Sequence, residues 1–341
     1  MMNNILNKIF PNRQSLDKYE RKAQRRLAGQ KTLSFAAVFF RTFLLIGLCF
    51  VILLPIFQKF SYAFRHPMDI TNPQVVWIPE NWSTINFQIA GELLVFWSSL
   101  FNTTILSFFT MVIQIMAAAI AGYSFARLKF KGHNILFFLI IFTLVVPNEA
   151  LHVSRTQFLV NTPFFGINLV ANVFSMYILA AFGQGIRSAI FIYLFRQFFK
   201  NIPVELEESA QVDGAGVIRT FWSVMLPNAR GAIVTVGLFA FVWQWNDYYF
   251  ANLLAYSNVF PVLSTRLGGG TDRLFTVMSG WVASGKNVFD SITDLTVASD
   301  PLFFGLIANT GALLMMLPLL IGYFFVQKQF VESIERTGIT G

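Results

Sequence analysis

Apolar segments of roughly twenty residues or more alternate with shorter polar segments along most of the chain. A helix needs about 20 predominantly apolar residues to cross the hydrocarbon core of a bilayer, and charges within it are costly. Six segments meet this condition: residues 42–60, 100–125, 134–151, 169–199 with an interruption at Arg187, 231–254 and 302–327. The pattern predicts an all-α membrane protein with six transmembrane helices.

Composition favours a membrane protein over a soluble one. Of the 341 residues, 55% are hydrophobic and only 12% are charged, whereas soluble domains carry about 25% charged residues. About 40 mostly polar residues precede the first apolar segment and no small-residue cleavage site follows it, so we expect an anchor and not a signal peptide. The expected organisation is a basic tail (1–41), a six-span domain (42–327) and a C-terminal tail (328–341).

The charge distribution predicts the orientation of the chain. With the N-terminus in the cytoplasm, 18 of the 25 Lys and Arg residues fall in cytoplasmic segments, so the positive-inside rule places both termini in the cytoplasm. The basic residues between Lys18 and Lys31 fit either anionic lipid or nucleic acid. A basic segment next to a membrane anchor favours the lipid bilayer, and we expect no nucleic-acid partner.

Residues that carry out catalysis or bind metals are sparse. The single Cys49 excludes a disulfide within the chain, and the three His residues lack the spacing of a zinc site. The segment 280–287 has the Gly and Lys spacing of a phosphate-binding loop, but Asn287 replaces the required Ser or Thr and the segment is expected outside the cell. We therefore expect no enzyme activity, no metal and no cofactor bound by this chain.

The polar segment 200–230, NIPVELEESAQVDGAGVIRTFWSVMLPNAR with Lys200 before it, is the expected cytoplasmic loop between the fourth and fifth spans. Pro203 suits the first turn of a helix, Gly214 interrupts that helix, and Pro227 ends a second one before the next span. Negative charge at the start of the first helix matches its dipole and comes from Glu205, Glu207 and Glu208. The apolar face of the second helix is predicted to hold Val217, Phe221 and either Val224 or Met225.

This loop resembles the cytoplasmic EAA loop of permease subunits of binding-protein-dependent ABC importers. Its motif here is Glu208-Ser209-Ala210, then Asp213-Gly214-Ala215, then Leu226-Pro227, with Ser209 in place of the commonest Ala. The resemblance extends to Asn102 and to residues 123–132, 147–149, 194–203, 245–254 and 331–341. It is strongest with the carbohydrate-uptake branch, of the smaller maltose-permease subunit type. The external segment 255–301 is longer than that family usually has between its last two spans.

The resemblance implies a transport subunit that couples to a separate engine. In that family the EAA loop docks in a groove of a cytoplasmic ATPase, so the loop residues expected to act in coupling are Glu207, Glu208, Ser209, Ala210, Asp213, Gly214, Ala215, Leu226 and Pro227. The implied partners are a second permease subunit, two ATPase subunits that bind ATP and Mg, and an extracytoplasmic binding protein. The implied location is a bacterial-type cell membrane, and the implied cargo is a sugar or oligosaccharide.

Polar and aromatic residues inside the apolar segments are candidates for the solute path. Aromatic faces stack on sugar rings and polar groups bond to hydroxyls, which makes candidates of Trp243, Trp245, Asn246, Asp247, Tyr248, Glu149 and Gln184. An aromatic belt with an interfacial polar cap is the alternative explanation of residues 243–248. Arg187, with Gly183 and Gly185 nearby, marks either a broken span beside a water-filled route or a helix end with a snorkelling Arg.

Two alternative functions remain open from the sequence. The EAA loop indicates the engine and not the cargo, so a peptide or a polyamine stands as an alternative solute. A secondary transporter driven by an ion gradient is a more distant alternative, because it is expected to show internal repeats and charged residues near the bilayer midplane. The sequence shows no such repeat.

Overall fold

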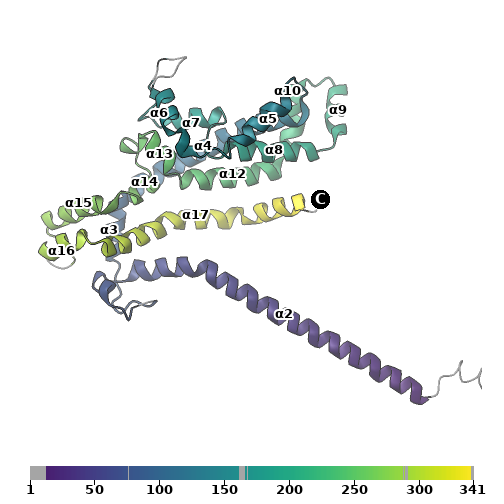
Figure 1. Ribbon diagram of the computed structural model, residues 1–341, viewed down its shortest axis with the longest axis horizontal. Helices are drawn as coiled ribbons and strands as arrows, with labels where there is room; N and C mark the ends of the chain where they lie inside the picture. The colour runs from purple at the N-terminus through teal and green to yellow at the C-terminus, as the bar shows by residue number, and fades with distance from the viewer. Residues whose placement is uncertain are drawn as a thin grey trace, which may run out of the picture. The chain divides into compact units, whose positions relative to one another are not determined.

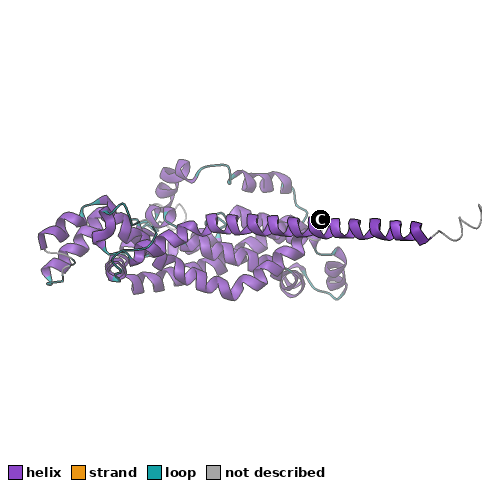
Figure 2. Cartoon of the chain, turned by 90° about the horizontal axis from the view of Figure 1, so that it is seen from below, coloured by secondary structure: helices purple, strands orange, loops and turns teal. Residues whose placement is uncertain are grey.

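A computed structural model describes residues 13–75, 77–160, 166, 168–286, 288 and 291–338, and nearly all of their regular structure is helical (Figure 2). Within these residues the only β-structure is an isolated bridge between Arg65 and Trp82. The longer helices are α2 (Arg13–Phe64), α3 (Ile85–Leu94), α4 (Phe96–Arg127), α5 (His133–Phe142), α8 (Ser188–Asn201), α12 (Arg230–Trp245), α15 (Gly270–Ala283) and α17 (Pro301–Gly338). The shorter helices are α6 (His152–Val160), α7 (Phe174–Ala181), α9 (Val204–Val212), α10 (Val217–Thr220), α11 (Leu226–Asn228), α13 (Tyr249–Leu253), α14 (Leu263–Leu267) and α16 (Ser291–Ala298).

The chain divides into two units, Met1–Gln58 and Lys59–Gly341, and the division falls within α2. The described part of the first unit is a single helix. Most of its described apolar side chains from Phe35 onward are solvent-exposed, with Phe35 at 75% and Phe43 at 68%. Large apolar side chains in this number need a non-aqueous environment, which supports the prediction that this helix is a membrane anchor.

The core of the second unit is the crossing of α4 with α8 and α12, and these helices lie side by side in Figure 1. Close approach of α4 and α8 depends on Gly122, because a Cβ atom there would lie 2.6 Å from Phe195 Cβ and 2.9 Å from the backbone nitrogen of Arg196. Small residues at helix crossings let backbones approach closely in membranes. The fully buried side chains of Phe195 and Phe199 fill the crossing beside Tyr123.

The six predicted spans are only partly reproduced as continuous helices. Among the described residues, three helices are long and apolar enough to cross a membrane, namely Ala37–Phe64, Phe96–Arg127 and Pro301–Glu332. A fourth is present if Val217–Asn228 and Arg230–Trp245, which meet at 78°, are counted as one span. The helix α5 is apolar but has only 10 residues. The all-helical membrane fold is confirmed, and the count of six stays a prediction.

Each of the remaining predicted spans is interrupted by residues that disfavour a continuous helix. In the segment 134–151 the helix ends at Phe142, and the backbone of Pro147 is extended. The segment 169–199 is split between α7 and α8, where Gly183 and Arg187 have positive φ values of 71° and 51°. A positive φ at Arg187 is unusual for a residue with a Cβ atom. The structure thus shows a broken helix at Arg187.

The expected external loop 255–301 is largely helical in the structure. Helices α15 and α16 pack with α3 and with the beginning of α17, and their shared core includes Leu274, Met278, Trp281 and Phe303. Helix α15 begins at Gly270, and the Tyr248 ring stands 2.7 Å from where a Cβ of Gly268 would lie. Leu274, Met278 and Trp281 recur at helical spacing between two groups of glycines, which explains why this segment is helical and not a loop.

Candidate functional site

The segment from α9 to α11 has the helix, bend and helix that the sequence predicts. Pro203 precedes α9, which ends at Val212, and Gly214 makes the turn with a φ of 80°. That conformation favours glycine, because a Cβ atom is strained there. After α10 the backbone forms a π-helix, Phe221–Met225, which continues into α11.

Two details of the second helix differ from the prediction. Phe221 and Met225 are buried, but Val217 is 51% exposed. The π-helix shifts the register after Thr220, so residues before and after it do not share one face. Pro227 lies inside α11, and the break before α12 comes at Ala229.

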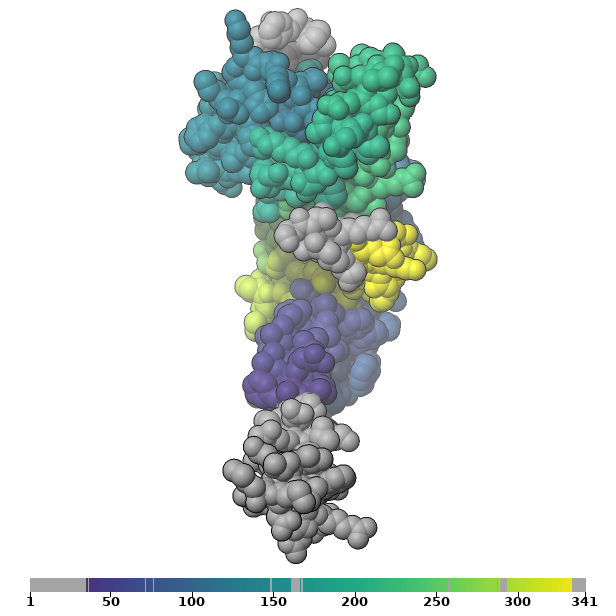
Figure 3. Space-filling view, turned by 90° about the vertical axis from the view of Figure 1, so that its right-hand side faces the viewer, coloured from purple at the N-terminus to yellow at the C-terminus, as the bar shows by residue number. Residues whose placement is uncertain are grey.

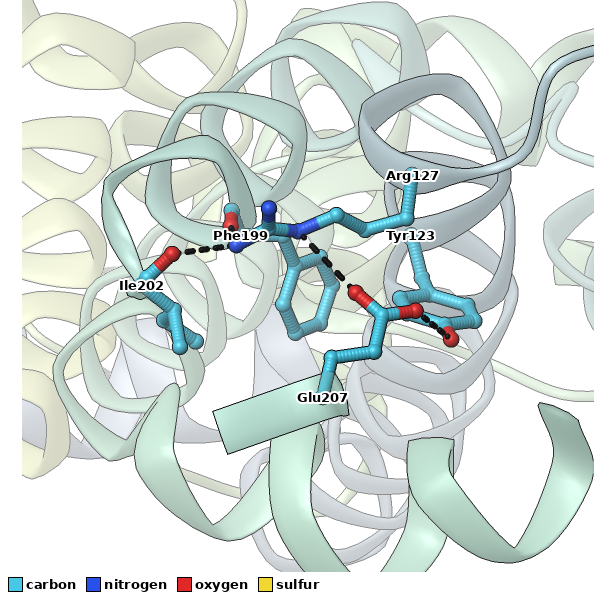
Figure 4. Close-up of polar contacts among 5 residues, drawn as sticks. All are labelled: Tyr123, Arg127, Phe199, Ile202 and Glu207. Carbon is cyan, nitrogen blue, oxygen red and sulfur yellow. Dashed lines mark hydrogen bonds and ion pairs between the residues drawn. The ribbon is translucent and has the colours of Figure 1, made fainter. Parts of the chain in front are cut away.

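The carboxylate of Glu207 joins α9 to the end of α4 (Figure 4). Its Oε1 accepts a hydrogen bond of 2.9 Å from the Tyr123 hydroxyl, and its Oε2 lies 3.5 Å from Arg127 Nε. Arg127 Nη2 also donates to the carbonyl of Phe199, at 2.8 Å, and to that of Ile202. The side chains of Arg127 and Glu207 are only 10% and 12% exposed. We call these five residues the Glu207 clamp.

Outside the clamp, the loop residues expected to act in coupling are exposed or half-buried. Figure 3 shows a face on which the green segment from α9 to α10 forms part of the surface. Glu208, Ser209, Asp213, Gly214 and Pro227 are exposed, whereas Ala210, Ala215 and Leu226 are half-buried. Apolar side chains are exposed beside these residues, including Val212 at 88% and Ile218 at 76%. A surface that combines carboxylates, small residues and exposed apolar groups is suited to a protein partner.

The aromatic segment 243–248 is divided among different environments. Trp245 is buried and its Nε1 donates to the carbonyl of Met315 at 3.2 Å. Asp247 is buried at the break after α12, where its carboxylate accepts from the backbone nitrogens of Phe250 and Ala251 at 3.1 Å each. Asn246 and Tyr248 are exposed. Trp245 and Asp247 therefore have hydrogen-bond partners within this chain, and their place on the solute path stays a prediction.

Glu149 and Gln184 come together in one cavity of about 400 Å³. The cavity lies at the break between α7 and α8, opposite the turn that follows α5. Arg155 and Arg187 also line it, together with Thr143, Ser188 and Phe250. Trp243 belongs beside this group, because the Arg187 guanidinium carbon lies 4.7 Å from the centre of its ring.

Gln114 of α4 holds the broken span in place. Its side chain is 2% exposed, and its Nε2 donates to the Ile186 carbonyl and to the Ser188 hydroxyl, both at 3.2 Å. A Cβ atom at Gly185 would lie 2.3 Å from the same nitrogen. Glycine at this position therefore permits the amide of Gln114 to approach the unwound backbone.

The sequence had not singled out four of these residues as site residues: Tyr123, Arg127, Gln114 and Arg155. Gln114 carried a usable signal, since a buried amide in an apolar span needs hydrogen-bond partners. Arg155, close to a predicted span end, also fits the rule that ionisable residues in membranes face a cavity or a partner. The Glu207 clamp carried no such signal, because each of its contacts joins two residues that are 72 to 84 positions apart in the chain.

A comparison with known families covers both the loop and the broken span. The model of the family "Binding-protein-dependent transport system inner membrane component" matches residues 114–335, well over half of the chain, including the loop and the cavity. The chain belongs to this family. It is an inner-membrane permease of a binding-protein-dependent ABC importer, and permease subunits of this kind have no ATPase activity of their own.

Individual relatives of this permease import several solutes. It is 29% identical, over 87% of its length and 93% of the other chain, to the maltodextrin transport system permease protein MalD of Streptococcus pneumoniae. It is 28% identical, over 64% of its length and 75% of the other, to the sn-glycerol-3-phosphate transport system permease protein UgpE of Yersinia enterocolitica. A crystal structure of a bacterial ABC transporter that imports the acidic polysaccharide alginate shares the fold, with a TM-score of 0.61 and 23% identity over 85% and 95% of the two chains.

Proposed function

We propose that this permease imports a sugar or an oligosaccharide, and that the segment from Glu207 to Pro227 docks on a cytoplasmic ATPase. A second permease subunit, two ATPase subunits and an extracytoplasmic binding protein complete the transporter. ATP and Mg bind to the ATPase subunits. Closure of the ATPases then pulls on the docked segment. The spans move in response, and the solute cavity changes from facing the cytoplasm to facing the outside.

The observation that carries this proposal is the pairing of an anchored face with an exposed face on α9. Glu207 is fixed by Tyr123 and Arg127, whereas the neighbouring Glu208 is exposed. A force applied to the exposed face is therefore transmitted through Glu207 to α4, which forms the centre of the bundle. An ordinary polar connector does not need a buried ion pair at its base.

The coupling residues divide by environment in a way that fits docking. Glu208 and Asp213 offer carboxylates to basic residues of a partner, and Gly214 leaves the backbone open, with no atom within 4 Å of a Cβ built there. Ser209, Ala210 and Ala215 are small enough for close approach. The exposed Val212 and Ile218 supply apolar contact area.

The orientation follows from the same proposal. An ATPase in the cytoplasm requires the segment 200–230 to be cytoplasmic, which agrees with the positive-inside rule and with both termini inside. The segment 255–301 then faces the extracytoplasmic binding protein. A count of six spans follows if the broken segments 134–151, 169–199 and 231–254 each cross the membrane once.

Relatives that transport maltodextrin favour a sugar, and relatives that transport glycerol phosphate leave a small non-sugar solute as the second candidate. A peptide or a polyamine has no support from these relatives. Membership of a binding-protein-dependent family favours an ATP-driven system over a gradient-driven one.

Affinity purification of the tagged permease in mild detergent tests the proposal. We expect a second permease and an ATPase to co-purify, and the ATPase activity to fall in Gly214→Trp. Gly285→Trp is the matched control, because Gly285 lies outside the docking segment and has a similarly positive φ of 75° and equally open surroundings. A wild-type chain that elutes alone from several detergents would contradict the proposal.

A further inference from the structure

The cavity at the broken span has an unbalanced charge. Its charged lining residues are Glu149, Arg155 and Arg187, so two guanidinium groups face one carboxylate and the formal charge is +1. Charges inside the membrane region are costly and are retained where they serve a solute or ion pathway. An anionic group from outside this chain would balance the excess positive charge of the lining.

Arg187 is held in a way that leaves its hydrogen-bond donors available. Its guanidinium carbon lies 4.7 Å from the Trp243 ring centre. Trp243 in turn stacks on Phe191, at 5.2 Å and 18°, and on Phe239, at 5.3 Å and 28°. A cation–π contact fixes the flat face of a guanidinium, but its N–H groups point outward in the plane. Throughout the described ranges the Arg187 guanidinium makes no hydrogen bond or ion pair.

Arg155 has a similar aromatic support. Its guanidinium carbon lies 5.5 Å from the Phe250 ring centre. The backbone nitrogen of Phe250 donates to Asp247, so the buried carboxylate fixes the ring on which Arg155 rests. The aromatic segment that begins at Trp243 therefore serves to position two cations beside one cavity.

We propose that this cavity receives the carboxylate or phosphate group of an anionic solute, so that the cargo is an acidic sugar or a phosphorylated polyol and not a neutral oligosaccharide. This inference rests on the proposed import function. Planar guanidinium groups pair with carboxylate and phosphate oxygens through two parallel hydrogen bonds. The amide of Gln184 and the hydroxyls of Thr143 and Ser188, which line the same cavity, offer partners for sugar hydroxyls.

The test is uptake into liposomes that contain the complete transporter with its binding protein, with ATP supplied to the ATPase side. Three labelled probes are compared: a uronic acid trisaccharide, sn-glycerol-3-phosphate and maltotriose. We expect uptake of one or both anionic probes. Uptake of the uronate alone assigns a carboxylate, and uptake of the glycerol phosphate alone assigns a phosphate.

Variants separate binding of the anion from assembly. Arg187→Gln is expected to lower anion uptake about 10-fold or more, which corresponds to about 1.4 kcal/mol, while the second permease and the ATPase still co-purify. Arg187→Lys should retain part of the uptake, because the positive charge remains. Lys129→Gln, at an exposed cation after α4, is the matched control and should leave uptake unchanged.

The failure of this inference is distinct from the failure of the proposed function. Uptake of maltotriose alone, or equal anion uptake by wild type and Arg187→Gln, overturns the anionic cargo while the importer stands. Absence of an ATPase from the purified complex overturns the import function and the inference with it.

Discussion

The Glu207 clamp makes a quantitative prediction about how α9 is held. Tyr123→Phe removes one hydrogen bond to a charged acceptor, and such bonds contribute about 1.5–3 kcal/mol. The aromatic ring remains and keeps its contacts with Phe199 and Phe221, at 5.8 and 5.3 Å between ring centres. The loss should therefore lie toward the lower end of this range.

Glu207→Gln should cost more than Tyr123→Phe. Removing one partner of a buried ion pair costs about 3–5 kcal/mol. The side chains here are about one tenth exposed, and Arg127 still donates to the carbonyls of Phe199 and Ile202, so the lower end of that range applies. The double variant should be less destabilised than the sum of the single variants by about 1 kcal/mol, because both changes break one network.

The assay is thermal or denaturant unfolding of the purified transporter, combined with uptake per ATP hydrolysed. Glu208→Gln is the matched control for unfolding, and Tyr193→Phe is the control for both unfolding and uptake, since both side chains are exposed and neither joins the clamp. Uptake per ATP should fall in Glu207→Gln, because the docked segment no longer moves with α4. A Glu207→Gln variant as stable as Glu208→Gln, or strictly additive losses, would refute this account of the clamp.

Three further predictions follow from packing, backbone geometry and charge. Gly122→Leu should prevent accumulation of folded permease in the membrane, because the Cβ atom meets the backbone of α8, whereas Gly91→Ala, with open space around it, should be tolerated; immunoblots of membrane fractions distinguish the two. Gly185→Val should displace Gln114 and abolish uptake, whereas Gly183→Ala should cost about 1–2 kcal/mol through its positive φ and retain some uptake. Burial acts to raise the pKa of Asp69, but hydrogen bonds from Asn81 outweigh it and hold the pKa below its ordinary value. Its stabilisation of residues 65–82 should persist above about pH 4 and disappear as the pH falls through the lowered pKa, a loss that limited proteolysis at graded pH detects and that Asp69→Asn should remove.

The sequence predicts the elements of this permease that depend on local patterns. Pro203, the glutamates after it and Gly214 predicted the start and the bend of the docking segment because capping and backbone preference act over a few residues. The same local rules identified Arg187 as a point where the span is interrupted. They did not decide between a break and a helix end, which depends on Gln114 in another helix.

Contacts between distant segments set the limit of sequence reasoning. Nothing local indicates that Tyr123 and Arg127 meet Glu207, or that Arg155 joins Glu149 and Gln184 in one cavity. Trp245 and Asp247 are residue types that suit a solute path. In the structure both are buried, where Trp245 donates to a carbonyl and Asp247 accepts at the start of a helix. Residue type alone did not separate a residue that lines a solute path from one that packs inside the protein, since the same side chains serve both purposes.

The central claim, that the segment from α9 to α11 docks on an ATPase, is tested most directly by site-specific cross-linking. Asp213→Cys in a Cys49→Ser background carries a maleimide reagent with a photoreactive second group, which needs no thiol on the partner, and Asp272→Cys on α15 is the exposed control. The account predicts that mass spectrometry finds the ATPase attached at position 213 and not at position 272. An ATPase that attaches at position 272, or that co-purifies but never attaches at 213, would contradict it.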